Sequence, residues 1–209
     1  MNLLDKLFEF ICKISKIGLP CGSHITRYYM YEHIKRIKTE LRGKSCRVLS
    51  ISHSANLADL LDVDAIEIIE ANYPDHNILS LNFEDNLFDL VISDQVLEHV
   101  EGSPQQAIDE CYRVLKVGGY ALHTTCLMNP VHGFPYDFWR FTPKALSLLH
   151  KDWSGIIDSG GWGNFETLKT LNINLRFGGI PHLKLHPLHK LATKNDPRWL
   201  IVTWILARK

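Results

Sequence analysis

The 209-residue sequence predicts an α/β protein in which helices cover both faces of a mostly parallel sheet. From Cys46 onward, short apolar runs rich in β-branched residues alternate with segments of helical periodicity. Strands that alternate with helices form parallel sheets, because each helix carries the chain back over one face of the sheet. The length fits one domain with a small appendage, at about 150 residues per domain.

The segment before Cys46 predicts a helical cap rather than part of the sheet. Apolar residues at three- and four-residue spacing predict an amphipathic helix over 2–17 and a second helix over 24–42. We therefore divide the chain into an N-terminal helical cap, residues 1–43, and a main domain, residues 44–209. The lysines of the first helix leave two roles open for it: packing on the main domain, which we favour, and contact with a membrane surface.

Within the main domain, two helices have clear start signals. Ser103 and Thr142 are N-cap residues, and each is followed by a proline at the first helical position. Gln106 completes a capping-box pattern, and Gly118 and Gly119 end the first of these helices. The remaining predicted elements are strands over 47–51, 65–69, 88–93, 119–124, 156–157 and 199–206, and helices over 57–61 and 164–175.

Charge and composition exclude several classes of protein. The 23 basic and 23 acidic residues balance, so we predict no nucleic-acid partner. No apolar run reaches the roughly 18–20 residues of a membrane span. The five cysteines are odd in number and form no C-x-x-C pair, which indicates reduced thiols and a cytoplasmic location. No group of histidines and cysteines has a recognised zinc spacing, so no metal site is predicted.

Three motifs of the main domain follow one another at characteristic spacing. Residues 88–91 read Phe-Asp-Leu-Val, residues 97–100 read Leu-Glu-His-Val, and residues 113–119 read Arg-Val-Leu-Lys-Val-Gly-Gly. Together they resemble the class I S-adenosylmethionine-dependent methyltransferases, and most of all the methyltransferase type 11 family, over residues 47–149. The resemblance implies a Rossmann-like fold with a seven-strand sheet whose last two strands are antiparallel. It also implies S-adenosylmethionine as the cofactor and methyl transfer to an oxygen or nitrogen of a small-molecule or glycan-type acceptor.

The resemblance further implies where the cofactor would bind, since ligands of open parallel sheets lie at the carboxyl ends of the strands. Glu70, with Glu67 as the fallback, would hold the two ribose hydroxyls, because a carboxylate can accept from both. Asn77 matches the position that meets the adenine amino group, with Ile78 beside it. The other expected cofactor contacts are Ser50, Ser52, His53 and Ser54 after the first strand, and Asp94 and Gln95 after the fourth.

The turn after the first strand departs from the family pattern. Ser52, Ser54 and Asn56 stand where the family has glycines, and Ser50 stands where it has an acid. Glycines allow a positive φ and a close approach of the backbone to a ligand, whereas serines bring side chains into that space. The alternative is therefore a non-catalytic protein of this fold, serving as a binding module or as the partner of an active subunit. A homo-oligomer also stays open.

The resemblance leads to candidate residues for methyl transfer. Because the donor is already activated, alignment can supply about 7–11 kcal/mol, and a base is needed only for an acceptor that carries a proton. His132 is the first candidate base and Asp137 the second. Arg140 would clamp an acidic acceptor, and Tyr136 and His99 are also expected on the substrate side. In the alternative interpretation, His132, Asp137 and Arg140 bond one another and only hold their loop.

Overall fold

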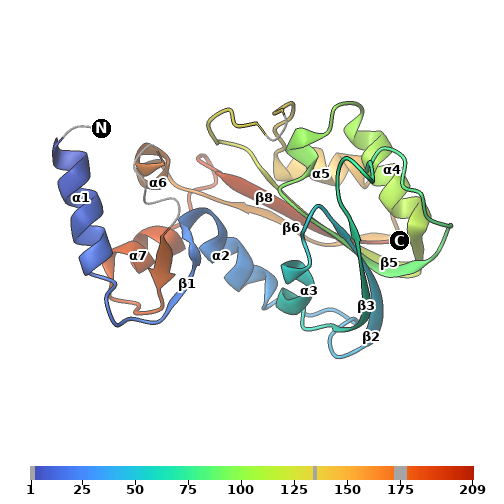
Figure 1. Cartoon of the computed structure of the whole chain (residues 1–209), viewed down its shortest axis with the longest axis horizontal. Coiled ribbons are helices and arrows are strands. Elements are labelled where there is room, and N and C mark those ends of the chain that lie inside the picture. Colours follow the sequence, from blue (N-terminus) through green and yellow to red (C-terminus); the bar gives the residue numbers. More distant parts are fainter. Residues whose placement is uncertain (1–2, 134–135, 172–177) are drawn as a thin grey trace. The chain divides into compact units, whose positions relative to one another are not determined.

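The computed structural model describes residues 3–133, 136–171 and 178–209 (Figure 1). The chain divides into two compact units. The smaller unit combines residues 1–33 with 161–202, and the larger unit combines residues 34–160 with 203–209. The N-terminal segment thus groups with part of the C-terminal third, and the separate cap over residues 1–43 stays a prediction.

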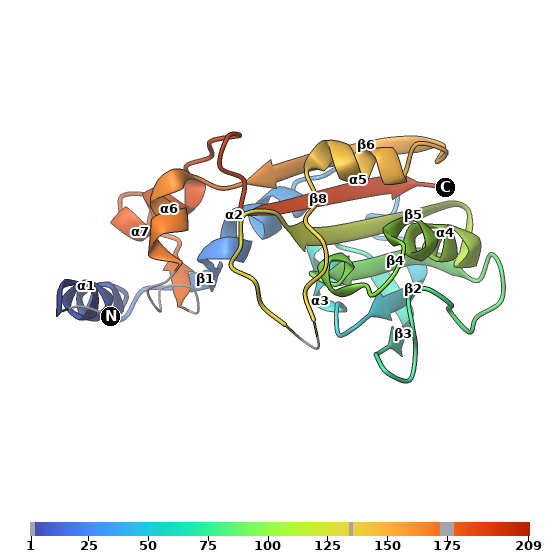
Figure 2. The ribbon, with the colours of Figure 1, turned by 90° about the horizontal axis from the view of Figure 1, so that it is seen from above.

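The larger unit is built on a six-stranded sheet with the strand order β3-β2-β4-β5-β8-β6 (Figure 2). Its strands are β2 (Ser45–Ile51), β3 (Asp64–Ala71), β4 (Phe88–Asp94), β5 (Leu115–Cys126), β6 (Gly155–Trp162) and β8 (Val202–Arg208). β2 pairs in parallel with β3 and β4, and β4 pairs in parallel with β5. β8 runs antiparallel to its neighbours, since the chain at its end bonds to the start of β5 and to the residue before β6. The mixed α/β sheet is confirmed.

This sheet has one strand fewer than the seven that the family resemblance implies. Between β3 and β4, the described chain outside named strands forms only an isolated bridge, between Asn77 and Ser80. The backbone after this bridge is bound by side chains of a helix instead. Leu81 donates its N–H to Glu110 and accepts from Arg113 through its carbonyl oxygen. Backbone groups that are bound in this way cannot pair with another strand.

Helices cover both faces of the sheet. They are α3 (Asn56–Leu60), α4 (Pro104–Val114) and α5 (Pro143–Leu149), with a short 3-10 helix, η1 (Leu97–His99), after β4. The hydroxyls of Ser103 and Thr142 accept from backbone N–H groups of the first turns of α4 and α5, which confirms both predicted caps. α4 and α5 pack on one face, where Ile108 and Leu146 join a buried cluster with Val91 of β4. α3 contacts β4 from the other face.

The smaller unit is mostly helical. It contains α1 (Leu3–Ile14), β1 (Cys21–His24), α2 (Ile25–Ile34), α6 (Phe165–Thr170), β7 (Gly179–Pro181) and α7 (Pro187–Thr193), with β1 and β7 antiparallel. The predicted helix over 24–42 was too long, because α2 ends at Ile34. The predicted helix over 164–175 is shorter as α6, and residues 172–177 lie outside the described part of the chain.

Four apolar side chains of α1 are exposed. Leu7, Phe10, Ile11 and Ile14 all have about half of their surface open. The choice between packing and membrane contact for this helix stays a prediction. Among the described residues, no helix has both the length and the apolar character that crossing a membrane requires.

Candidate functional site

A cleft of about 600 Å³ opens in the larger unit at the carboxyl ends of β2, β3 and β4. β2 lies between the other two strands, so the chain passes from one side of β2 to the other between β3 and β4. Open α/β sheets bind their ligands at this reversal of strand order. The volume also falls within the range of about 300–1,000 Å³ that small-molecule sites have. Predicted residues on the cleft wall are Ser52, His53, Asn77, Ile78, Gln95 and His99.

The turn after β2 forms without glycine. Ser52 and His53 adopt φ values of 53° and 61°, in the left-handed region, which costs a residue with a side chain about 1–2 kcal/mol. Hydrogen bonds offset this cost. Ser52 donates its N–H to the carbonyl oxygen of Ala71 at 3.1 Å, and His53 donates its N–H to the Asn72 amide oxygen at 3.1 Å. The turn therefore takes a path that glycines would adopt without strain.

The two outer serines of this turn face the protein interior. The Ser50 hydroxyl accepts from the Ser54 N–H at 2.9 Å, and the Ser54 hydroxyl donates to the Ile51 carbonyl oxygen. The same Ser54 hydroxyl accepts from the Asp94 N–H at 2.7 Å. Both serines are fully buried and neither lines the cleft. The structure thus places them beneath the turn, where they hold it against β4, rather than on the cleft wall expected of cofactor contacts.

Replacing His53 with glycine is expected to raise the free energy of unfolding by about 1 kcal/mol. The substitution removes the cost of the left-handed conformation, less the extra entropy that glycine gives the unfolded chain. Urea denaturation measures the difference. The matched control is His53→Ala, which removes the imidazole but keeps the Cβ, and equal stabilities of the two variants would contradict the argument.

Two polar residues end β3 beside this turn. A carboxylate oxygen of Glu70 accepts from the His53 N–H at 3.2 Å, but Glu70 is not among the residues that line the cleft. Asn72, two residues further, does line it. The fallback residue, Glu67, is instead paired with Arg47 at 2.6 Å. Asn72 is not among the predicted contacts, although the alternation of a strand places it on the same side as Glu70.

The residues after β4 divide between the cleft and the interior. Gln95 lines the cleft with a φ of 59°, and its side-chain amide donates to the Thr124 hydroxyl at 3.1 Å. Asp94 is not on the cleft wall, because its carboxylate accepts from that same Thr124 hydroxyl. Three left-handed residues with side chains therefore surround one cleft, and such strain gathers at functional sites.

A second pocket of about 490 Å³ adjoins the cleft. The two share Glu101 and Phe138, neither of which was predicted. The second pocket is lined by three of the predicted residues, His132, Tyr136 and Asp137. A cofactor-sized cleft thus opens beside a smaller space that carries the predicted base.

Three charged and polar side chains of the loop after β5 bind one another. Arg140 binds both carboxylate oxygens of Asp137, one of them at 2.6 Å, and this guanidinium holds the pKa of Asp137 well below its usual range. A carboxylate with a lowered pKa takes up a proton less readily, so this pairing disfavours the role of second base, which stays a prediction for Asp137. The same carboxylate accepts from the His132 N–H at 2.8 Å and lies 3.1 Å from the ring Nδ1. The three residues hold their loop, and His132 also faces the pocket.

The loop is anchored to the segment after β4. The carbonyl oxygen of Glu98 accepts from the Phe138 N–H at 2.8 Å, and His99 Nδ1 donates to the carbonyl oxygen of Tyr136 at 2.6 Å. The rings of His99 and His132 meet edge to face, with 5.0 Å between centroids. Of the residues expected on the substrate side, His99 and Tyr136 line a pocket, whereas Arg140 lines neither.

Comparisons with known proteins agree with this geometry. Residues 34–123 match the family model of a methyltransferase domain of type 11. The 2-methyl-6-phytyl-1,4-hydroquinone methyltransferase 1, chloroplastic, of Oryza sativa is 27% identical over 150 residues, 69% of this chain and 40% of the relative. An uncharacterised protein of Haemophilus influenzae is 35% identical over 98 residues, 44% of this chain and 38% of the relative. The chain thus spans about two fifths of the curated relatives that it matches.

A solved structure shows the same fold over the whole chain. The S-adenosylmethionine-dependent methyltransferase from Archaeoglobus fulgidus aligns with a TM-score of 0.52 at 16% identity, covering 97% of this chain and 99% of that one. The segment that matches the family model contains the three strands whose ends form the cleft. Residues 34–123 are therefore similar to the methyltransferase domain of type 11, and the chain shares the fold of this solved class I methyltransferase.

Proposed function

We propose that this protein transfers the methyl group of S-adenosylmethionine to an oxygen or nitrogen of a small-molecule or glycan-type acceptor. The observation that carries the proposal is the cleft that stays open beside the glycine-free turn. Side chains in place of glycines threaten to fill the space of the cofactor, but Ser50 and Ser54 turn inward and leave about 600 Å³. The five free cysteines support a reducing compartment, so a cytoplasmic location stays part of the proposal.

The residues on the cleft wall fit a nucleoside. Ile51, Ile78 and Val96 offer apolar surface for a base, and Asn72 and Asn77 offer amide groups for hydroxyl and amino groups. In this proposal, Asn72 on the cleft wall holds the ribose together with Glu70, which adjoins the wall through its bond to His53, and Asn77 with Ile78 holds the adenine. Among the predicted cofactor contacts, Gln95 is the closest in sequence to Glu101, and Glu101 lines both pockets. When bound, the sulfonium of the cofactor supplies an activated methyl group.

His132 is the proposed base for an acceptor that carries a proton. Its Nδ1 faces the ionised carboxylate of Asp137, which favours the tautomer with the proton on Nδ1. Nε2 is then the nitrogen that accepts the proton of the acceptor. A carboxylate that orients a histidine and stabilises its charged form is the same device as in the Ser-His-Asp enzymes.

The second pocket supports an acceptor with a flat or ring-shaped part. Tyr136 and Phe138 present aromatic side chains with 6.1 Å between ring centroids, and Glu101 adds a carboxylate that can accept from hydroxyls. A sugar or a phenol has both features. The rice relative, which is named for a hydroquinone, is consistent with a phenolic acceptor.

S-adenosylmethionine or S-adenosylhomocysteine is expected to stabilise the protein by about 2.7 kcal/mol at 100 times its Kd. A thermal shift or calorimetric titration measures this directly. Replacing Glu70 with alanine is expected to weaken binding roughly 10–100-fold, the worth of hydrogen bonds to a charged group. The matched control is Glu67→Ala, which removes a carboxylate from the same strand without touching the turn.

The absence of any response at millimolar cofactor would contradict the proposal. It would favour the alternative, a non-catalytic protein of this fold that serves as a binding module or as the partner of an active subunit. A wild-type response that Glu70→Ala leaves unchanged would keep the function and remove Glu70 from the ribose site.

A further inference from the structure

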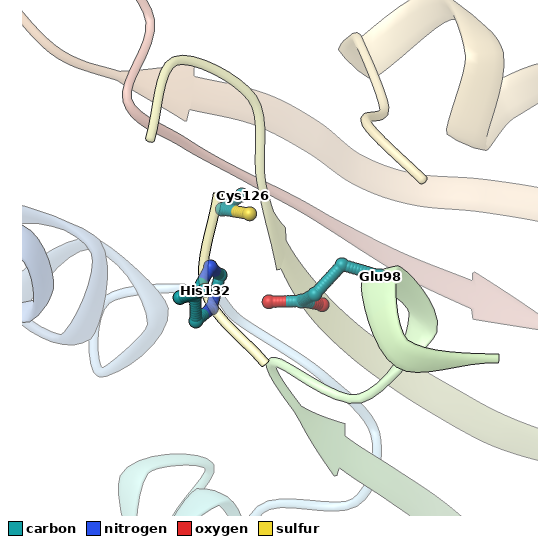
Figure 3. A group of neighbouring side chains, drawn as sticks. All are labelled: Glu98, Cys126 and His132. Atoms are coloured by element: carbon teal, nitrogen blue, oxygen red, sulfur yellow. The ribbon is translucent and has the colours of Figure 1, made fainter. Parts of the chain in front are cut away.

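Three potential metal ligands converge beneath the loop that carries His132 (Figure 3). Glu98 comes from η1 after β4, Cys126 ends β5, and His132 follows six residues later. A carboxylate oxygen, the Cys126 sulfur and a ring nitrogen all lie within 4.8 Å of one another. Glu98 and Cys126 are buried, and His132 is partly exposed and lines the second pocket.

The donor set matches the preferences of zinc. Zn²⁺ binds cysteine sulfur at about 2.3 Å, histidine nitrogen at about 2.0–2.1 Å and carboxylate oxygen at about 2.0–2.2 Å. Three atoms within 4.8 Å of one another have a common point at most about 2.8 Å from each. Movements of the ligand atoms by less than ~1 Å then bring all three to zinc distances. A hard cation such as Mg²⁺ prefers oxygen ligands, so the sulfur and nitrogen argue against it.

The surroundings hold the ligands in place, as outer-shell residues do in zinc sites. His132 Nδ1 lies 3.1 Å from Asp137, which Arg140 fixes in turn, so that Nε2 is the nitrogen for an ion. The Thr125 hydroxyl donates to a carboxylate oxygen of Glu98 at 2.8 Å. Glu98 is also joined to the loop that carries His132, since its carbonyl oxygen accepts a hydrogen bond from the Phe138 N–H.

We propose that Glu98, Cys126 and His132 bind a divalent cation of the zinc class. The expectation of no metal site rested on sequence spacing, but these ligands come from the ends of two neighbouring strands and a loop, which no short motif reveals. Three protein ligands leave a further position for water or for an acceptor atom. Because the ion takes the same nitrogen that would accept a proton, its binding shuts off the base. This last consequence rests on the proposed function, whereas the binding itself does not.

Cobalt titration of the full-length, chelator-treated protein tests the site. One equivalent of Co²⁺ is expected to give the near-ultraviolet absorption of a sulfur-to-cobalt charge transfer, and Zn²⁺ is expected to displace it. Cys126→Ser is expected to lose this band. The matched control is Cys21→Ser, which removes the exposed cysteine of the smaller unit and is expected to keep the band.

Two further variants keep the test decisive if Cys126→Ser fails to fold. Glu98→Gln and His132→Gln preserve side-chain shape, and each is expected to weaken Zn²⁺ binding at least tenfold. A band that persists in Cys126→Ser, or Zn²⁺ affinity that neither glutamine variant changes, would overturn the site. Wild-type protein that binds S-adenosylmethionine but not Co²⁺ would refute the metal site and leave the function standing. Binding of Co²⁺ without a response to the cofactor would support the metal site and contradict the proposed function.

The effect on catalysis has its own measurement. Saturating Zn²⁺ is expected to slow methyl transfer by the wild-type protein at least tenfold, and a chelator is expected to restore it. An increase in rate on adding Zn²⁺ to the site would refute the competition between metal and base.

Discussion

Methyl transfer to a hydroxyl acceptor is expected to fall by about 10²–10⁴-fold when His132 is replaced with glutamine. Glutamine keeps a polar side chain in the pocket but cannot accept the proton that leaves the acceptor. The measurement is transfer of a radiolabelled methyl group from S-adenosylmethionine to a panel of phenols, sugars and amines, repeated with the fastest acceptor.

Cofactor affinity separates this effect from a general disturbance of the site. His132 lines the second pocket and not the cleft, so His132→Gln is expected to bind S-adenosylmethionine as the wild type does. Asp137→Asn is expected to slow transfer by a comparable factor, because an amide beside Nδ1 favours the tautomer that carries the proton on Nε2. A rate within threefold of the wild type for His132→Gln would remove it as the base.

The free energy of unfolding is expected to fall by at least about 3 kcal/mol between pH 7 and pH 4 because of a buried pair of histidines. His123 and His150 lie with 5.5 Å between ring centroids, and both are almost completely buried. Burial lowers the pKa of His150 to about 4 and lowers that of His123 further below its usual value. In the described structure, the Nε2 atoms of both rings lack a hydrogen-bond partner, so nothing there stabilises an imidazolium.

The direction of this effect follows from proton binding. In the unfolded chain both histidines have a pKa of about 6.5. Below that pH, the unfolded state therefore binds protons that the folded state does not bind. Stability is therefore lost as the pH falls from about 6.5 toward 4, and it is unaffected above that range. Acidic groups with a lowered pKa, such as Glu110, lose their contribution only below about pH 4.5.

Urea denaturation as a function of pH measures the loss. His150→Phe keeps a ring of similar size in the buried cluster. Between pH 6.5 and pH 4, the free energy of unfolding of this variant is expected to depend less steeply on pH, because unfolding takes up as much as one proton fewer. The control is Trp153→Phe, which changes a ring that packs on His150 without removing a titratable group and is expected to leave this slope unchanged. An unchanged slope in His150→Phe would contradict the assignment.

Much of the fold could be predicted from the sequence because its signals are local. The hydroxyls at Ser103 and Thr142 cap their helices as their positions before proline predict. The apolar runs at β2, β4 and β5 became parallel neighbours. The missing seventh strand was less predictable, because the contacts of Leu81 with Glu110 and Arg113 depend on how α4 lies in space.

The candidate site was predictable by position but not by orientation. Strand ends predicted Ser52 and Gln95 beside the cleft, the family resemblance predicted Asn77 there, and all three line it. Strand ends could not distinguish Ser54, whose hydroxyl turns inward, from Ser52, which faces the cleft, because the left-handed turn between them reverses the direction of the side chains. The approach of His132 to Glu98 depends on a loop that meets another strand end, and no periodicity encodes such a meeting.

The position of the Ser54 hydroxyl has a consequence for how a ligand enters. By binding the Ile51 carbonyl oxygen and the Asp94 N–H together, it locks the floor of the cleft across β2 and β4. The floor then cannot widen by separation of these strands without leaving buried polar groups unpaired. A ligand of the proposed kind would therefore enter over the outer rim of the cleft, where Tyr73 is exposed, rather than by separation of the strands.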